Sequence, residues 1–296
     1  MSPEVAELVA ALDREGYVAD AAVATALFLA RRLEKPLLVE GDAGVGKTEL
    51  AKVLARILET DLLRLQCYEG LDVQTALYEW DYPRQLLRVR LSDARGEDPR
   101  AVEAAIFSRE YLLERPLLQA ITPRPRPPVL LIDEIDRADD GFEAFLLELL
   151  SEFQVSIPEL GTIRAEHPPH VILTSNRTRE LGDALRRRCL YLYVEHPSFE
   201  KEVQIIRRRV PEAEEGLARE VGQFLSALRS RDLVKPPGVA ETLDWTRALV
   251  SLRQRTLDAD VVRQTLGCLL KARADLEAVD GPAVAALVEQ ARGGGR

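Results

Sequence analysis

Cysteine is scarce in this 296-residue sequence, and its pattern removes two classes of protein. The three cysteines, Cys67, Cys189 and Cys268, are odd in number, far apart and without CxxC spacing. Such a set predicts neither a disulfide framework nor a cysteine-based metal site, and it is typical of a reducing compartment. We therefore expect a cytoplasmic protein.

Long apolar runs are also missing. The runs that occur, such as Val129 to Ile132, fall far below the roughly 18–20 residues that span a bilayer. The N-terminus lacks the basic region, apolar run and small-residue cleavage site of a secretory signal. These absences predict a soluble protein with no stable membrane insertion.

An excess of positive charge is the third absence. The net charge is −9, which argues against general binding to nucleic acid or to anionic membranes. With 46% apolar and 30% charged residues, the chain can bury a core. Its length suits one domain of about 200 residues and a smaller one.

Short apolar strands alternate with helices over the first two thirds of the sequence, and only helical patterns follow Pro197. The expected strands are residues 36–40, 62–65, 129–132, 171–174 and 190–194. This order predicts an α/β fold, a parallel sheet flanked by helices, with a smaller all-helical domain after it. We expect residues 1–196 to form the first domain, 197–292 the second and 293–296 a flexible tail.

The middle of the chain is harder to interpret. Residues 78–90 suggest a small hairpin or loop, and residues 99–118 suggest a helix. Four prolines between residues 123 and 128 then predict an extended linker, because proline fixes φ and cannot continue a helix. A second hairpin is expected at 154–164, with its turn near Glu159–Gly161.

A glycine-rich loop between a strand and a helix carries the clearest chemistry. It matches GxxxxGK(S/T) in full, over Gly41, Asp42, Ala43, Gly44, Val45, Gly46, Lys47 and Thr48. Glycines let backbone N–H groups surround phosphate oxygens, and the helix N-terminus adds partial positive charge. Lys47 would reach the β- and γ-phosphates and the Thr48 hydroxyl would hold Mg²⁺. We extend this predicted nucleotide site to Glu49.

Two adjacent carboxylates follow the apolar strand at 129–132. We expect Asp133 to hold the Mg²⁺ shell and Glu134 to orient the attacking water, since ligands lie at the carboxyl ends of parallel strands. The alternative is an ordinary strand end leading into a capped helix. For Asp136 and Arg137 we expect only a local ion pair.

Two further positions have both a structural and a functional interpretation. Asn176 follows the strand at 171–174 and either turns the chain or positions water beside the γ-phosphate. The run Arg186, Arg187 and Arg188 is either a solvated basic turn or an arginine finger for a neighbouring site. The second run, at 207–209, fits a solvated helix face or an interface.

The order of these motifs resembles an AAA+ ATPase, and more narrowly the MoxR group. Residues 133–138 and 184–189 are similar to that group's Walker B and arginine-finger segments. Residues 65–72 and 78–87 resemble the accessory ATPases of molybdenum-containing carbon monoxide dehydrogenase and related hydroxylases. The resemblance covers roughly residues 17 to 250.

The resemblance implies ATP and Mg²⁺ as ligands and a ring, usually hexameric, with sites at subunit interfaces. It also implies a helix-2 insert within residues 66–120, a partner with a von Willebrand factor type A domain, and a client metalloenzyme. The family's nucleotide and catalytic roles fall on Lys47, Thr48, Asp133, Glu134 and Asn176. Arg188 fits the finger position best, with Arg187 as the alternate.

One position departs from the family pattern. Many relatives carry an arginine early in a helix of the small domain, where it touches the γ-phosphate. The aligned residue here is Thr242, and Arg247 lies about a turn and a half further on. The sequence therefore does not show how the small domain senses the nucleotide. The prediction of ATP binding does not depend on this position.

Three functions follow from these observations. The first is an ATP-driven remodeller that helps a metalloenzyme to mature, through cofactor insertion or subunit rearrangement. The second is a scaffold whose nucleotide state gates partner binding with little turnover. The third is a nucleic-acid motor, against which the acidic balance counts. Intact Glu134 and Asn176 favour the first.

Overall fold

A computed structural model describes residues 1–279 and 281–293 of the chain. Its contacts divide the chain into two compact units. The first combines Met1–Ala21, Gly41–Leu50 and the chain from Tyr193 onward, and the second combines Ala22–Glu40 with Ala51–Leu192. Each unit is described by itself, and the domain boundary near residue 196 stays a prediction.

Up to β9 the chain alternates helices and strands, as the sequence predicts. The elements are α1 Pro3–Arg14, α2 Ala21–Arg32, β1 Leu37–Glu40, α3 Lys47–Ile57, β2 Leu62–Gln66, α4 Val73–Leu77, β3 Tyr78–Trp80, α5 Tyr82–Arg95, α6 Pro99–Ile106, η1 Arg109–Tyr111, β4 Leu112–Glu114, α7 Pro116–Ile121, β5 Val129–Asp133, η2 Ile135–Arg137, α8 Asp140–Glu152, β6 Gln154–Ile157, β7 Gly161–Arg164, β8 His170–Ser175, α9 Asp183–Arg188 and β9 Leu190–Tyr193. In the part of the chain that the structure describes beyond β9, the elements are all helices: α10 Phe199–Arg209, α11 Glu215–Arg229, α12 Val239–Ser251, α13 Ala259–Leu269, α14 Arg273–Ala278 and α15 Pro282–Gly293.

The main sheet has five strands in the order β2-β5-β8-β1-β9. Strand β8 pairs in parallel with both β1 and β5, and β5 pairs in parallel with β2. The carboxyl ends of these strands therefore meet at one edge of the sheet, where Asp133 and Ser175 are the last strand residues. The five predicted strands and the α/β fold class are confirmed.

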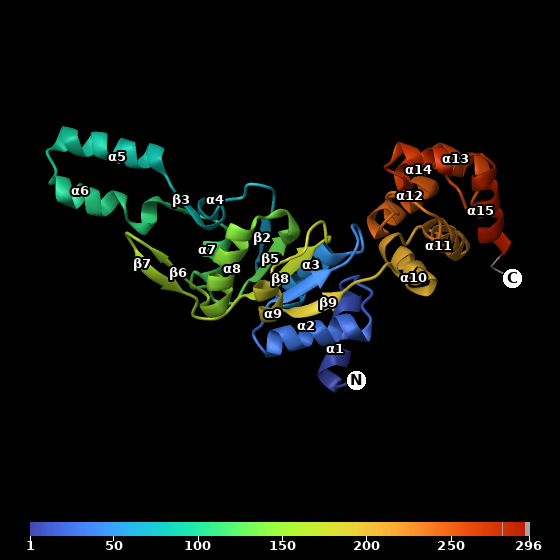
Figure 1. Ribbon diagram of the computed structural model, residues 1–296, viewed down its shortest axis with the longest axis horizontal. Coiled ribbons are helices and arrows are strands. Elements are labelled where there is room, and N and C mark those ends of the chain that lie inside the picture. Colours follow the sequence, from blue (N-terminus) through green and yellow to red (C-terminus); the bar gives the residue numbers. More distant parts are fainter. Residues whose placement is uncertain (280, 294–296) are drawn as a thin grey trace. The chain divides into compact units, whose positions relative to one another are not determined.

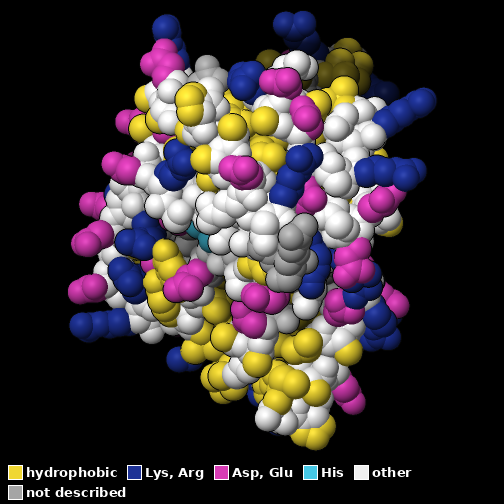
Figure 2. Space-filling view, turned by 90° about the vertical axis from the view of Figure 1, so that its right-hand side faces the viewer, with side chains coloured by type: hydrophobic (Ala, Val, Ile, Leu, Met, Phe, Trp, Pro, Cys, Tyr) yellow, Lys and Arg dark blue, Asp and Glu magenta, His cyan; other side chains and the backbone are white. Residues whose placement is uncertain are grey.

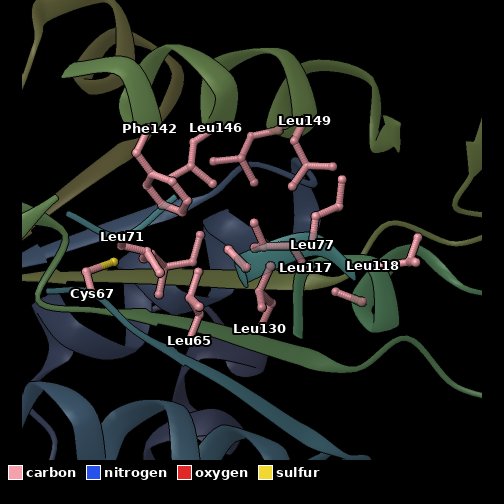
Figure 3. Packing of buried hydrophobic residues seen from close by; sticks show 14 of the residues in the cluster. Leu65, Cys67, Leu71, Leu77, Leu117, Leu118, Leu130, Phe142, Leu146 and Leu149 are labelled. Atoms are coloured by element: carbon pink, nitrogen blue, oxygen red, sulfur yellow. The ribbon is translucent and has the colours of Figure 1, made fainter. Parts of the chain in front are cut away.

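Both faces of the sheet are covered, so β1 and β5 are buried along their whole length and are apolar up to their last residues, Glu40 and Asp133. On one face, α4, α7 and α8 pack onto β2 and β5. Figure 3 shows Phe142, Leu146 and Leu149 of α8 pointing toward Leu117 and the strand residue Leu130. The side chains that alternate with these along the strands are buried against the opposite face.

The predicted hairpin at 78–90 is wrong. Strand β3 instead pairs antiparallel with β4, more than 30 residues later, so that Tyr78 lies opposite Glu114. Residues 82–95 are helical because Asp81 caps the helix and Pro83 occupies its first turn. Figure 1 shows α5 and α6 lying side by side and extending together away from the sheet.

The single helix predicted over 99–118 is also wrong. Helix α6 ends at Ile106, where the Phe107 ring packs edge-on against Trp80 with 5.5 Å between ring centroids. Proline lacks an N–H and clashes with the preceding turn, so Pro116 begins a new helix, α7, instead of continuing an old one. The predicted hairpin at 154–164 is confirmed as β6 and β7.

Helices α10 to α15 form a bundle with its own core (Figure 1). Phe224 of α11 and Trp245 of α12 are fully buried there, with 5.1 Å between their ring centroids. In the predicted tail, Gly293 is the last residue of α15, and residues 294–296 lie outside the described residues.

The surface mixes charges of both signs. On the face in Figure 2, Lys and Arg side chains are interspersed with Asp and Glu side chains and with hydrophobic ones. No helix within residues 1–279 and 281–293 is both long and apolar enough to cross a membrane.

Candidate nucleotide-binding and catalytic site

The loop that follows β1 needs glycine for steric reasons. Gly41 has φ of 156°, and a Cβ placed on it would lie 2.2 Å from the carbonyl oxygen of Val194. Gly44 has φ of 80°, and its carbonyl accepts a 2.9 Å hydrogen bond from the Val239 amide at the start of α12. A side chain would therefore displace the backbone at either position.

The ammonium group of Lys47 is held over this loop. Lys47 is the first residue of α3 and only 6% exposed, and its Nζ donates to the carbonyls of Gly41 at 2.6 Å and Asp42 at 2.7 Å. Of the predicted nucleotide residues, 41–48 thus form one loop and the beginning of one helix. Glu49 also lies in the first turn of α3, where Arg209 Nη1 is 3.3 Å from its Oε1.

His196 adjoins the loop and was missed by sequence reasoning. Its Nε2 lies 3.4 Å from Asp42 Oδ2, and its Nδ1 is buried with no hydrogen-bond partner among the described residues. Burial lowers the pKa of His196, and the positive charge of Arg229 adds to the effect. A neutral imidazole beside the loop keeps one nitrogen free to accept a hydrogen bond.

Asp133, the last residue of β5, is buried, and both of its carboxylate oxygens accept hydrogen bonds. Its Oδ1 accepts a 2.5 Å hydrogen bond from the Thr174 hydroxyl of β8. Its Oδ2 accepts from Arg64 of β2, at 3.0 Å from Nε and 2.6 Å from Nη2. The strand order β2-β5-β8 places these three residues on neighbouring strands, which sequence spacing alone does not reveal.

Glu134 and Asn176 meet at the same edge of the sheet. The Asn176 side-chain amide lies 3.4 Å from Glu134 Oε1, and Arg137 Nε lies 2.7 Å from Glu134 Oε2. Glu134 has φ of 55°, which is rare for a residue with a Cβ and is often found at functional sites. Its amide donates to the Thr174 hydroxyl at 2.9 Å, so Thr174 links both carboxylate residues.

The expected ion pair between Asp136 and Arg137 is wrong, because Arg137 pairs with Glu134. Asp136 is 2% exposed, and its Oδ2 accepts from the backbone amides of Asn176 at 3.2 Å and Thr178 at 2.9 Å. Its Oδ1 is buried without a partner among the described residues. Asp136 therefore fixes the backbone on both sides of Arg177.

The predicted finger lies in α9, which α8 holds in place. Glu143 of α8 is buried, accepts a 2.9 Å hydrogen bond from the Gly182 amide before α9, and pairs with Arg179. All three arginines at the end of α9 are exposed. Arg186 stacks over Tyr191, 5.7 Å from the ring centroid, whereas Arg188 makes no hydrogen bond or ion pair with any residue that the structure describes.

In the helical bundle, Thr242, the position that the resemblance aligns with a family arginine, is fully buried. Its hydroxyl donates to Glu202 at 2.8 Å, and Arg229 forms a two-bonded ion pair with Glu202 at 2.6 and 2.8 Å. Arg247 is exposed and pairs with Asp244 at 3.1 Å. The cation beside Thr242 is thus Arg229, which comes from the preceding helix.

The structure gathers the predicted residues into two groups. One is the phosphate-loop sequence 41–48, and the other joins Asp133, Glu134 and Asn176. Sequence reasoning missed the contacts that support the second group, which Arg64, Asp136, Thr174 and Thr178 make. It also missed the contact of Glu143 with the Gly182 amide before α9. For Asp136, Thr174 and Thr178 the available signal is a polar side chain at or shortly after the end of a buried strand, whereas Arg64 lies within the edge strand β2 and gives no such signal.

Among solved structures, the chain is similar to the Thermotoga maritima RuvB Holliday junction branch migration motor. The identity is 19%, with 83% of this chain and 66% of that chain covered and a TM-score of 0.47. Two point variants of the same RuvB give 20% and 21% identity, cover 89% and 83% of this chain and 69% and 67% of theirs, and have TM-scores of 0.49. The chain thus spans about two thirds of the length of these proteins.

Residues 36–189 match the family described as AAA domain, dynein-related subfamily. The match covers just over half of the chain and includes the loop at 41–48, the β5 carboxylates, Asn176 and the arginines of α9. Members of this family are P-loop nucleotide-binding domains. The chain belongs to the dynein-related subfamily of AAA domains.

Proposed function

We propose that this chain hydrolyses ATP, with phosphates bound by residues 41–48 and water activated by Glu134. The contact network of Asp133, Glu134 and Asn176 at the carboxyl edge of the sheet carries the proposal. β1 belongs to the same sheet and ends at Glu40, immediately before the phosphate loop. Parallel α/β sheets bind ligands at this edge.

Each residue has a distinct proposed role. Lys47 would neutralise charge on the β- and γ-phosphates, and Thr48 and Asp133 would hold Mg²⁺, which would supply further positive charge against the phosphates. Glu134 accepts a hydrogen bond from the attacking water and takes its proton as the bond from the water oxygen to the γ-phosphorus forms. The bond between the γ-phosphorus and the bridging oxygen breaks, and that oxygen leaves with ADP. Asn176, already 3.4 Å from Glu134, donates to that water or to the γ-phosphate.

We infer that sites are completed between copies of the chain in a ring, with six as the expected number. Arg188 supports this, because it is exposed at the end of a helix and has no partner among the described residues. A guanidinium so placed can stabilise charge on a neighbour's transferring phosphoryl group. Arg187 remains the alternate finger.

The proposed client is a metalloenzyme, which this ATPase remodels during maturation in the manner of the MoxR group. A second proposed partner is a protein with a von Willebrand factor type A domain. The supporting stretches are 65–72 and 78–87, which resemble accessory ATPases of molybdenum hydroxylases. The second stretch forms β3 and the start of α5, where Tyr82, Leu86 and Leu87 are exposed. Apolar side chains on a projecting helix are available to a protein partner.

The deciding experiment is ATPase activity per mole, measured with Mg²⁺ over a range of protein concentrations. Activity that rises with concentration supports shared sites. Glu134→Gln should lower kcat about 10²-fold or more while ATP stays bound. Arg188→Ala should lower kcat by about 10³-fold, and its matched control is Arg207→Ala, at an exposed arginine of α10.

Mixing tests the finger directly. A ring of Arg188→Ala and Glu134→Gln subunits contains some interfaces with an intact finger and an intact Glu134, so mixing two inactive proteins should restore part of the activity. Equal loss of activity in the Arg207→Ala control, or no recovery on mixing, argues against a finger at Arg188.

One observation favours the second candidate, a nucleotide-gated scaffold with little turnover. Both catalytic carboxylates are engaged by arginines, Asp133 by Arg64 and Glu134 by Arg137. Neither can bind metal or water freely until its arginine moves. If Glu134→Gln rings mature the client as well as the wild type does, the scaffold is preferred over the remodeller.

A further inference from the structure

A cavity of ≈ 150 Å³ lies in the second compact unit, at the end of the sheet opposite the catalytic carboxylates. It is bounded by α2, by the first residues of β1 and β8, and by Pro127 and Pro168. Leu37 and His170 begin these strands, whereas Glu40 and Ser175 end them. The cavity is therefore separate from the edge of the sheet where Asp133 and Asn176 lie.

Most of the wall is apolar and belongs to the core. Leu27 and Ala30 of α2, Leu37 of β1, Leu54 of α3 and Ile172 of β8 line it, and each is at most 7% exposed. A cavity of about this volume encloses one benzene ring. The space thus suits the apolar body of a molecule with roughly six to ten non-hydrogen atoms.

Arg31 gives the cavity its charge. Its Nε is buried and has no hydrogen-bond partner, and its guanidinium forms no ion pair with any residue of 1–279 and 281–293. Burial lowers the pKa of Arg31, but a guanidinium stays charged at neutral pH. An unpartnered cation in the wall of an apolar cavity requires an explanation, because leaving such a donor unmet costs free energy.

The remaining polar wall is consistent with an anion. Lys35 lies on the lining and adds a second positive charge, and His170 can donate one N–H as a neutral ring. Glu34 is the one carboxylate on the lining, and it is exposed. The lining therefore carries more positive than negative charge, with the planar guanidinium of Arg31 its most buried cation.

We propose that this cavity binds a small carboxylate whose apolar body fills the space between α2 and the sheet and whose carboxylate pairs with Arg31. A guanidinium and a carboxylate match as two parallel hydrogen bonds, whereas a bare phosphate would leave the apolar wall without a partner. The proposal concerns a site other than the nucleotide site and does not depend on ATP hydrolysis.

The test uses para-fluorobenzoate as the probe, with the full chain and fluorine NMR. We expect saturable binding with a Kd on the order of 1 mM, a value usual for so small a ligand. Arg31→Gln should weaken binding at least tenfold, because the substitution removes the positive charge and the parallel N–H donors of the guanidinium. Arg32→Gln, the same change at the exposed neighbour, should leave the Kd within about twofold.

A second variant tests the volume of the cavity with Arg31 intact. Ala30→Leu places extra methyl groups in the cavity and should also weaken the probe at least tenfold. Circular dichroism and nucleotide affinity verify that each variant folds, and Arg31→Gln should fold because it breaks no bond. The proposal is overturned by any of three results: no saturable binding up to about 20 mM probe, an unchanged Kd in Arg31→Gln, or inorganic phosphate that binds as tightly as the probe.

Discussion

Asp136 anchors Thr178 with three hydrogen bonds, and these bonds hold the chain that carries Asn176. The Thr178 amide and hydroxyl donate to Asp136 Oδ2 at 2.9 and 2.7 Å, and the hydroxyl also lies 3.3 Å from the Asp136 carbonyl oxygen. β5 and β8 are neighbours in the sheet, so this anchor joins the segments that follow both strands. In the proposed mechanism, Asp136 and Thr178 would be positioning residues that act through Asn176.

The first prediction tests this anchor. Thr178→Val removes the hydroxyl bonds and should lower kcat for ATP about 3- to 10-fold. Asp136→Ala leaves two backbone amides without an acceptor and should lower kcat by about 10- to 100-fold. The KM for ATP should change less than twofold, since neither residue belongs to the phosphate loop. Asp140→Ala, at an exposed position on α8, is the control. A rise in KM with constant kcat would show that the anchor does not act on catalysis.

Arg64 provides the second prediction. Because its guanidinium occupies Asp133 Oδ2, it would compete with the proposed Mg²⁺ for that oxygen. Arg64→Gln should therefore lower the Mg²⁺ concentration that gives half-maximal ATPase activity about 3- to 10-fold. The matched control is Arg126→Gln, at an arginine that pairs with Glu59 at the surface. A higher Mg²⁺ requirement in Arg64→Gln would mean that the arginine orients Asp133 for the metal.

The sequence predicts the phosphate loop and the carboxylate pair, but it does not predict the contacts of Arg64 and Asp136 that support them. The phosphate loop is one contiguous stretch of sequence, and so is the pair Asp133 and Glu134 at the end of β5. The chemistry of each depends on local geometry, so the sequence pattern predicts both. Arg64 is 69 residues from Asp133 and meets it only because β2 pairs with β5. Single-sequence reasoning had no means to predict that pairing.

The same limit explains the errors in the fold. β3 and β4 are three residues each, too short to show a period, and their pairing encloses the whole α5–α6 segment. Pro116 was a usable local signal, because proline inside a predicted helix marks a boundary. The sequence favours an ion pair between Asp136 and its neighbour Arg137, but a buried carboxylate with two backbone amides nearby is better satisfied by those amides.

The third prediction concerns Glu143, which joins α8 to the start of α9. Removing its carboxylate leaves the Gly182 amide without its acceptor and takes from Arg179 its buried carboxylate partner, so that, among the described residues, Arg179 keeps only the exposed Asp140 and backbone carbonyls. Glu143→Ala should lower the free energy of unfolding by about 2–3 kcal/mol, less than a fully buried pair would cost, because Arg179 is partly open to water. Urea denaturation measures the change, with Glu148→Ala, exposed on the same helix, as the control. Equal effects of the two substitutions would show that Glu143 is not a special contact.

His170 gives the fourth prediction, a pH dependence of stability. Burial, with a smaller contribution from the charge of Arg31, lowers the pKa of His170 from 6.5 to about 4. Between these values the unfolded chain binds a proton that the folded chain does not, so stability rises with pH. The contribution of His170 is therefore complete above pH 6.5 and is lost as the pH falls toward 4. The loss should amount to about 1–2 kcal/mol, because part of the ring is open to water.

The measurement is urea denaturation of the wild type and His170→Asn from pH 7.5 to pH 4.5. Carboxylates titrate in both proteins, so only the difference between their unfolding free energies reports on His170. We expect that difference to move in favour of the variant as the pH falls, because asparagine carries no proton to be excluded. His167→Asn, at an exposed histidine on the same segment, shows what deleting a surface histidine does. A difference that stays constant over this range would mean that His170 can be protonated in the folded chain as easily as in the unfolded one.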